Sequence, residues 1–294
     1  MNRGRWESAF LACVWMGLAA VHGVASAAPD RVQFPSLDAP AGEAVALSAW
    51  WFRAEAAQGA ASAPAKAPAI VLLHGCGGML DRKGEPSARI REYAALLNQQ
   101  GWHALAVDSL SARGEKELCT QRIGSRKITQ VHRRRAALQW LATQAGVDAD
   151  RLALLGWSHG GSAVLAAGNL EHPEVAGSPV KPRLAVAFYP GCANEARHGF
   201  RPVADTLLLV GLADDWTPAA PCQALAGARA GHAVRVEAYE GAFHGFDGRA
   251  PLVLRRDVPN GVHPGQGVHV GGHPAAREQS RQALLLALQQ AFSR

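Results

Sequence analysis

The chain has 294 residues, of which 48% are hydrophobic, and its formal net charge is +6. This length and apolar content allow one substantial buried core. The mild basic excess comes without the aromatic platforms and the large basic patch that are typical of nucleic-acid binding. Its densest basic run, His132–Arg135, is most simply the solvated face of a helix. We therefore expect a globular protein with no nucleic-acid partner.

Residues 1–27 have the pattern of a signal peptide. Arg3 and Arg5 precede an apolar stretch, Ala9–Ala20, and Ala25-Ser26-Ala27 forms a small-residue cleavage signal. The alternative is a membrane anchor, but the apolar run is shorter than the ~20 residues that a bilayer span needs. We predict export to the periplasm or the medium, with a mature chain that does not enter a membrane.

After this segment, apolar strands and helical stretches alternate with short connections. Strands are expected at Arg31–Ser36, Ala44–Arg53, Ala69–Leu73, His103–Asp108, Leu152–Leu155, Leu184–Tyr189, Thr206–Val210 and Val234–Tyr239. Helices are expected at Arg89–Gln100, Ile128–Ala145, Gly160–Gly168, Pro218–Ala230 and Pro274–Phe292. The Ala, Gly, Ser and Pro composition of Ala54–Pro68 indicates a flexible loop within the domain. The alternation predicts an α/β fold with a mainly parallel central sheet and helices on both faces. We expect one domain over 28–294, without a large cap domain.

The segment Gly156-Trp157-Ser158-His159-Gly160 has the G-x-S-x-G pattern of a nucleophile elbow. It stands between an expected buried strand and an expected helix, which is the context that the motif requires. A serine on so tight a turn has a strained backbone, and its neighbours approach other backbone without a Cβ atom. Ser158 is therefore the candidate nucleophile, and the alternative is a serine that only caps the helix.

Candidates for the other members of a catalytic triad follow two later strands. Asp214 and Asp215 come after Thr206–Val210, and His244 comes after Val234–Tyr239. Because reactive groups gather at the carboxyl ends of parallel strands, these side chains are expected near Ser158. The order serine, aspartate, histidine is that of the α/β-hydrolases.

We choose Asp214 as the triad acid because it stands in the turn three residues after Gly211, the position of the acid in the family that the chain resembles, described below. Asp215 or Thr217 is expected to cap the helix that follows. In this arrangement the histidine acts as general base toward the serine, and the carboxylate holds the tautomer of its imidazole. The oxyanion donors are expected to be the backbone N–H groups of His159 and Cys76.

Four stretches resemble the dienelactone hydrolase family: Val71–Gly75, Gly156–Gly160, Gly211–Asp214 and Tyr239–Phe246. The resemblance implies a compact α/β-hydrolase domain without a large lid, which hydrolyses small esters or lactones without a metal or other cofactor. The founding enol-lactone hydrolases have a cysteine where this chain has Ser158, and a glutamate where it has Gly75.

The resemblance also implies candidate substrate contacts. Arg113 looks similar to an arginine that binds the substrate carboxylate in that family, and Arg249 falls near a second one. The motif Gly-Trp-Ser-x-Gly-Gly also looks like that of exported polyester-cleaving hydrolases, in which the tryptophan lines an open cleft. Trp157 and Trp216 are candidates to line such a cleft, with packing in the core as the alternative for both.

Four cysteines remain after Cys13 is removed with the signal peptide, an even number that suits an oxidising compartment. Of the three possible pairings we favour Cys76–Cys119 and Cys192–Cys222. In the expected fold, each of these pairs joins loops that follow neighbouring strands.

The segment Val258–Pro274 contains His263, His269 and His273 among glycines and prolines. Three histidines raise the possibility of a metal site. Their spacing on irregular backbone matches no familiar site, so we expect no bound metal. The segment is expected to border the mouth of the active site and to shape access to it.

These observations predict an exported serine hydrolase that acts on small-molecule carboxylic esters or lactones through an acyl-enzyme intermediate. The nearest alternative is a polyesterase or a peptidase on the same scaffold. A different class is a catalytically silent protein that keeps the fold for recognition alone. The complete set of Ser158, Asp214 and His244 favours the enzyme.

Overall fold

A computed structural model describes Met1 and residues 28–37, 44–54, 66–122 and 131–294. The expected signal peptide, apart from Met1, lies outside the described residues, as do 55–65 of the expected flexible loop. In the described part of the chain, no helix has the length and apolar character needed to cross a membrane.

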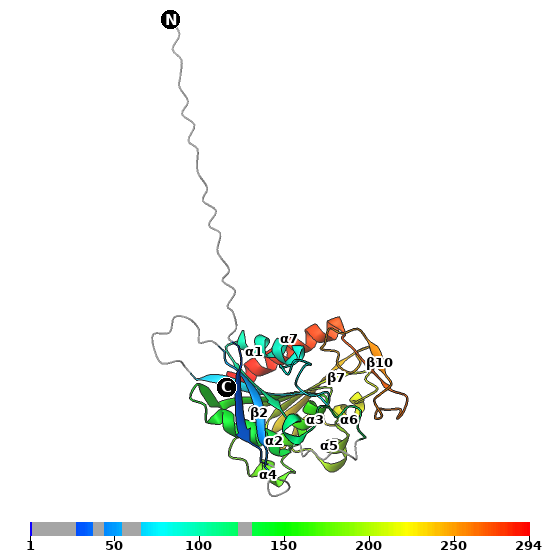
Figure 1. The fold of residues 1–294 in the computed structure, drawn as a ribbon, viewed down its shortest axis with the longest axis horizontal. Coiled ribbons are helices and arrows are strands. Elements are labelled where there is room, and N and C mark those ends of the chain that lie inside the picture. The colour runs from blue at the N-terminus through cyan, green and yellow to red at the C-terminus, as the bar shows by residue number, and fades with distance from the viewer. Residues whose placement is uncertain (2–27, 38–43, 55–65, 123–130) are drawn as a thin grey trace.

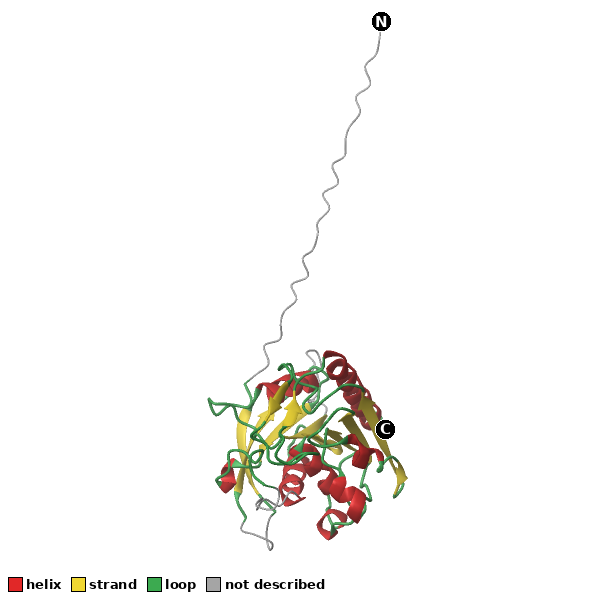
Figure 2. Cartoon of the chain, turned by 90° about the vertical axis from the view of Figure 1, so that its right-hand side faces the viewer, coloured by secondary structure: helices red, strands yellow, loops and turns green. Residues whose placement is uncertain are grey.

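The centre of the fold is a nine-stranded sheet in the order β1-β2-β4-β3-β5-β6-β7-β9-β8 (Figures 1 and 2). Its strands are β1 (Asp30–Pro35), β2 (Ala46–Phe52), β3 (Ala67–Leu73), β4 (His103–Asp108), β5 (Val147–Trp157), β6 (Leu184–Phe188), β7 (Asp205–Gly211), β8 (Gly227–Arg229) and β9 (His232–Tyr239). The six strands from β4 to β9 in this order are parallel, and β1, β2 and β8 are antiparallel additions at the two edges. The predicted mainly parallel sheet is confirmed.

Helices cover both faces of the sheet, and the strands are accordingly apolar on both sides. Helices α1 (Ala88–Asn98) and α7 (Pro274–Phe292) lie on one face, and α2 (Val131–Ala142) and α3 (His159–Ala167) lie on the other (Figure 1). In β3, Ile70 and Leu72 belong to the buried hydrophobic cluster under α1 and α7. Val71 and Leu73 belong to the cluster on the opposite face, under α2 and α3. Each such buried side chain contributes roughly 1.5–3 kcal/mol before the opposing entropy. No large cap domain is present among the described residues.

Short helices occupy the connections: η1 (Ser111–Arg113), α4 (Pro173–Ala176), α5 (Ala193–His198) and α6 (Ala219–Gln223). The helix predicted over Pro218–Ala230 is wrong beyond Gln223. Gly227 has a φ of 116°, which no helix accepts, and it begins β8. Ala230 and Gly231 then have φ values of 50° and 82°, and this left-handed pair closes a tight hairpin onto β9.

Both predicted disulfides are present, Cys76–Cys119 and Cys192–Cys222. Cys76 follows β3 and Cys119 lies beyond β4, while Cys192 follows β6 and Cys222 lies in α6 after β7. β3 pairs with β4 and β6 pairs with β7. Each bridge therefore joins loops at neighbouring strand ends, as expected.

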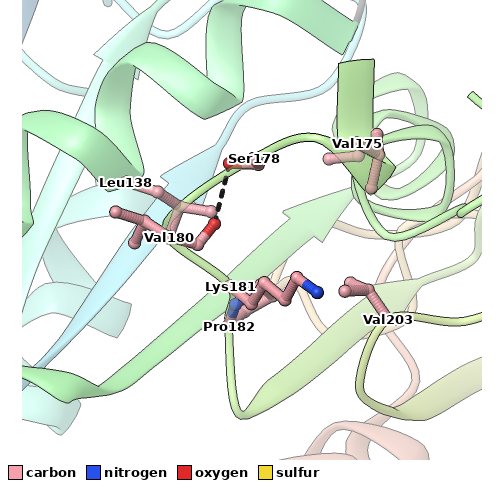
Figure 3. A pocket seen from close by; sticks show the side chains of 8 residues that line it. Leu138, Val175, Ser178, Val180, Lys181, Pro182 and Val203 are labelled. Carbon is pink, nitrogen blue, oxygen red and sulfur yellow. Dashed lines mark hydrogen bonds between the residues drawn. The ribbon is translucent and has the colours of Figure 1, made fainter. Parts of the chain in front are cut away.

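Two hollows lie away from the carboxyl ends of the strands. One is a cavity of about 10 Å³ beside α2 and α4, where Figure 3 shows Leu138, Val175 and Val203 around it. A space of this size holds about one water molecule. The other is an open groove of about 390 Å³ at the amino ends of β6, β7 and β9. Ser158 and His244 line neither of them.

The close approach of α3 to β3 gives a stability prediction. A Cβ atom at Gly160 would lie 2.0 Å from the carbonyl oxygen of Leu73, whereas one at Gly146 would meet only the His103 ring, at 3.8 Å. Gly160→Ala should therefore lower the free energy of unfolding by about 1–3 kcal/mol or more, because the backbone must shift. Gly146→Ala should leave it within roughly 1 kcal/mol of wild type. Urea denaturation of both variants measures this, and equal stabilities would contradict the packing described.

Candidate active site

Ser158 stands alone between β5, which ends at Trp157, and α3, which begins at His159. Its φ of 54° and ψ of −118° are strained for a residue with a side chain. Its backbone N–H donates to the carbonyl of Phe188 at 2.9 Å, so the turn is tied to the neighbouring strand β6. This is the strand, turn and helix that the G-x-S-x-G pattern predicts.

A continuous hydrogen-bonded chain starts at this serine. The Ser158 hydroxyl lies 2.9 Å from Nε2 of His244, and Nδ1 of His244 lies 2.9 Å from Oδ2 of Asp214. Both the histidine and the aspartate are only 4% exposed. With the Nδ1–H donated to the carboxylate, Nε2 is left as an acceptor for the serine O–H. The three residues that the sequence singled out, from three different strand ends, are thus in contact.

The carboxylate of Asp214 is held by its own turn. Its Oδ1 accepts the backbone N–H groups of Trp216 at 2.8 Å and of Thr217 at 2.9 Å. The other oxygen, Oδ2, is left to face His244. This Asx-type turn fixes the orientation of the carboxylate and explains why Asp214, and not Asp215, reaches the histidine.

The helix caps predicted at Asp215 and Thr217 are wrong. Helix α6 begins at Ala219 without a side-chain cap. The Asp215 carboxylate instead accepts the backbone N–H of His269 at 2.8 Å and lies 2.7 Å from Nδ1 of the same residue.

The Thr217 hydroxyl instead contacts both Asp214 and His244. It is 3.0 Å from Oδ2 of Asp214, 3.1 Å from Nδ1 of His244 and 3.0 Å from the carbonyl oxygen of Tyr189. Sequence analysis missed this contact, because a threonine next to a proline at a helix start has the local signature of a cap.

The glycine-rich loop after β3 lies against Ser158. A Cβ atom on Gly75 would be 3.6 Å from that of Ser158. His74 fixes this loop, because its Nδ1 donates to the carbonyl of Gly75 at 2.7 Å and its Nε2 accepts the N–H of Ser109 at 3.1 Å. Cys76 follows in the same loop, and His159 is the first residue of α3. Their backbone N–H groups stay the predicted oxyanion donors.

The two tryptophans have different positions. Trp157 is 1% exposed and packs against Tyr93 and Phe188 in the core, so the prediction that it lines a cleft is wrong. Trp216 is half-buried, and its ring centroid lies 4.6 Å from that of His244. It also packs against the cluster around the Cys76–Cys119 bridge. Trp216 is therefore the tryptophan that borders the triad.

The two arginines also differ. Arg113 donates to the carbonyl of Ser109, the residue whose N–H binds His74, and so it lies next to the glycine-rich loop. Its contact with substrate stays a prediction. Arg249 is 73% exposed and pairs with Glu92 on α1 at 3.0 Å. This ion pair gives no support to the substrate-binding role predicted for Arg249.

The histidine-containing segment is more regular than predicted. Its β11 (Val268–Val270) pairs with β10 (Val253–Arg255), and Val270 also bridges to His244. His273 caps α7 by accepting the N–H of Ala276 at 3.2 Å. In the part of the chain that the structure describes, no three His, Cys, Asp or Glu side chains gather as metal ligands would. The hairpin is thus attached directly to the turn that carries His244.

Comparison with known proteins agrees with this geometry. The sequence model of the dienelactone hydrolase family matches residues 54–292. The chain therefore belongs to the dienelactone hydrolase family and is a hydrolase of the α/β-hydrolase fold. None of the curated proteins matches its sequence.

Several solved structures share the fold at low sequence identity. The dienelactone hydrolase-like promiscuous phosphotriesterase P91 from metagenomic libraries is 17% identical, with 90% of this chain and 99% of that one covered, and a TM-score of 0.57. A thermophilic esterase from Thermogutta terrifontis, with propionate bound, is 19% identical over 84% and 90% of the two chains, with a TM-score of 0.52. A puromycin-hydrolyzing peptidase from Mycobacterium tuberculosis is 21% identical over 78% and 38%, with a TM-score of 0.54. These similarities concern the fold.

The two contacts of Asp215 predict how the hairpin is held. Asp215→Ala should increase amide hydrogen exchange at 268–270, because β11 loses the acceptor for the His269 N–H. Asp257→Ala is the matched control, since that exposed carboxylate pairs only with Arg255 on β10 among the described contacts. Hydrogen–deuterium exchange read by mass spectrometry compares the variants. Equal protection of β11 in both would show that Asp215 does not hold the hairpin.

Proposed function

We propose that this protein is an exported serine hydrolase that cleaves small-molecule carboxylic esters or lactones through an acyl-enzyme intermediate. One observation carries the proposal: the unbroken chain of hydrogen bonds from the Ser158 hydroxyl through His244 to Asp214. A serine hydroxyl is a weak nucleophile at neutral pH, and a histidine within hydrogen-bond reach is the group that activates it.

The reaction follows from these contacts. His244 takes the proton of Ser158 as Oγ attacks the ester carbonyl, and a tetrahedral intermediate forms. Asp214 stabilises the imidazolium, which then gives the proton to the leaving alcohol as the ester C–O bond breaks. Water, activated by the same histidine, attacks the acyl-enzyme and releases the acid and free Ser158. The step consumes only water and needs no cofactor.

The oxyanion of each tetrahedral intermediate requires donors. We assign this role to the backbone N–H groups of Cys76 and His159, one from the loop beside Ser158 and one from the start of α3. The Cys76–Cys119 bridge and the hydrogen bonds of His74 support a rigid loop at this position. A rigid donor costs little reorganisation when charge develops on the substrate.

Surrounding residues support a substrate with an uncharged ester group. Trp216 offers an apolar surface beside His244, and Gly75 leaves open the position where the founding lactone hydrolases have a glutamate. Export is supported by the two disulfides, which persist in oxidising compartments. We accordingly propose that residues 1–27 are removed and that 28–294 form a single domain.

Replacement of the nucleophile tests the proposal. Ser158→Ala should lower turnover of a short-chain chromogenic ester by at least three orders of magnitude, because the acyl-enzyme no longer forms. Mass spectrometry after treatment with a fluorophosphonate should find the label on Ser158 in the wild type. Ser162→Ala, four residues later in α3, is the control and should still be labelled.

The substrate panel separates the alternatives. Short and long esters, lactones, a polyester film and a peptide amide would be compared at the same enzyme concentration. Preferential turnover of the amide or the film would favour the peptidase or the polyesterase. A folded wild type that neither turns over nor is labelled would leave the binding protein as the better interpretation.

A further inference from the structure

We propose that Tyr189 is a positioning residue for His244, held in place by hydrogen bonds that run from the partly exposed Arg89 through the buried Asp247 to the Tyr189 hydroxyl. This inference rests on the proposed function, in which His244 is the general base. It adds a second polar chain, separate from Asp214, that fixes the imidazole.

Tyr189 lies directly against the histidine. The two ring centroids are 4.6 Å apart with an interplanar angle of 59°, and Tyr189 is 2% exposed. Together with Trp216, also at 4.6 Å, it gives the imidazole two aromatic neighbours. The position of the Tyr189 ring therefore limits the orientations that His244 can take.

The backbone of Tyr189 is strained, and several contacts hold it. Its φ of 37° is in the left-handed region, which a bulky residue adopts only when its surroundings require it. Its N–H donates to the carbonyl of Leu209 at 2.7 Å, and its own carbonyl accepts the Thr217 hydroxyl at 3.0 Å. Backbone strain of this kind is concentrated at functional sites. At Tyr189 it accompanies the contact of the ring with His244.

The side chain of Tyr189 ends at a buried carboxylate. Its hydroxyl donates to Oδ1 of Asp247 at 2.6 Å, and Nε of Arg89 donates to Oδ2 at 3.2 Å. Asp247 is 1% exposed, so neither oxygen is open to solvent, and the buried Tyr93 of α1 is a further group that interacts with this carboxylate. Arg89 comes from α1, so this chain joins the helix layer to the carboxyl edge of the sheet.

The ionisation of Tyr189 and of Arg89 is consistent with these hydrogen bonds. Burial raises the pKa of Tyr189 well above its ordinary value, so the phenol keeps the proton that it donates. Burial alone would lower the pKa of Arg89, but the charge and hydrogen bond of Asp247, together with the nearby Tyr189 and Tyr93, raise that pKa. The three hydrogen-bonded side chains are thus the Arg89 cation, the Asp247 carboxylate and the neutral Tyr189 phenol.

Asp247 lies three residues after His244, in the turn that directly follows the histidine. The turn is closed by the N–H of Gly248, which donates to the carbonyl of Gly245 at 2.9 Å. Asp247 is therefore connected to His244 through the turn that follows the histidine and through the Tyr189 ring. A histidine held in this way keeps Nε2 directed at Ser158.

Two variants of the mature protein, residues 28–294, test the role of these hydrogen bonds. Tyr189→Phe removes only the hydroxyl, and Asp247→Asn removes the charge while keeping the shape. A small displacement of a catalytic group has large effects on rate, so kcat should fall about tenfold in the first and about 10- to 100-fold in the second, with KM within twofold of wild type. The rate at which a fluorophosphonate labels Ser158 should fall in parallel.

The pH dependence distinguishes positioning from general instability. In Asp247→Asn the positive charge of Arg89 is no longer balanced, which disfavours the imidazolium. The acid limb of the kcat/KM profile should then move to lower pH, whereas Tyr189→Phe should leave it in place. Glu92→Gln is the control, because Glu92 is also on α1 but pairs with Arg249, Arg277 and Arg281. It should leave kcat and the profile unchanged.

The outcomes are separate from those of the proposed function. With an active wild type, the positioning role would be overturned if Tyr189→Phe and Asp247→Asn both keep full kcat and Asp247→Asn also leaves the acid limb unmoved. If the wild type has no turnover, the proposed function fails, and NMR titration of the His244 imidazole still decides the inference. A lower titration pH in Asp247→Asn than in wild type and Glu92→Gln supports it, and identical curves overturn it.

Discussion

The structure depends on the close approach of three backbone segments around Ser158. Gly160 lies against the carbonyl of Leu73 on β3, and a Cβ atom at Gly156 would lie 2.2 Å from the carbonyl oxygen of Gly160. Only glycine allows β3, β5 and α3 to meet at this distance. The chain between the two glycines must then turn within one residue, and Ser158 takes the strain. The same contact brings the glycine-rich loop next to the serine, so that the proposed nucleophile and the proposed oxyanion donors are positioned by one packing constraint.

A second close approach of two backbone segments sets the distance between Asp214 and His244. A Cβ atom at Gly211 would lie 2.2 Å from the carbonyl oxygen of Ala242, and the N–H of Ala213 donates to that same carbonyl at 3.1 Å. The turn after β7, which carries Asp214, is thus packed directly on the turn after β9, which carries His244. Because β7 and β9 are neighbours in the sheet, the register of the strands is transmitted to the two side chains.

The neighbouring residues Asp214 and Asp215 have different partners. Asp214 faces the histidine, whereas Asp215 holds β11 and with it the hairpin that bridges to His244. Backbone hydrogen bonds therefore connect the end of the hairpin to His244, and His273 at the start of α7 to Phe246 in the next turn. Tyr189 and Trp216 complete the surroundings of the imidazole with apolar surface, which strengthens its polar contacts because water is kept away.

The sequence by itself determined the alternation of strands and helices, the order Ser158, Asp214, His244 and both disulfides. These follow from local composition together with one rule, that parallel strands end at a common edge. It did not determine toward which face of the sheet a strand residue points, because helices cover both faces and the strands are apolar on both. For Trp157 the sequence therefore left both a cleft and the core open, and the structure places it in the core. Nor did it determine the partners of Asp215 and Thr217, since His269 is 54 residues and His244 is 27 residues away in sequence. The strain at Tyr189 and its contact with Asp247 have no local signature, because the groups that hold Tyr189 come from distant segments, β7, the turn after β7 and the turn after His244.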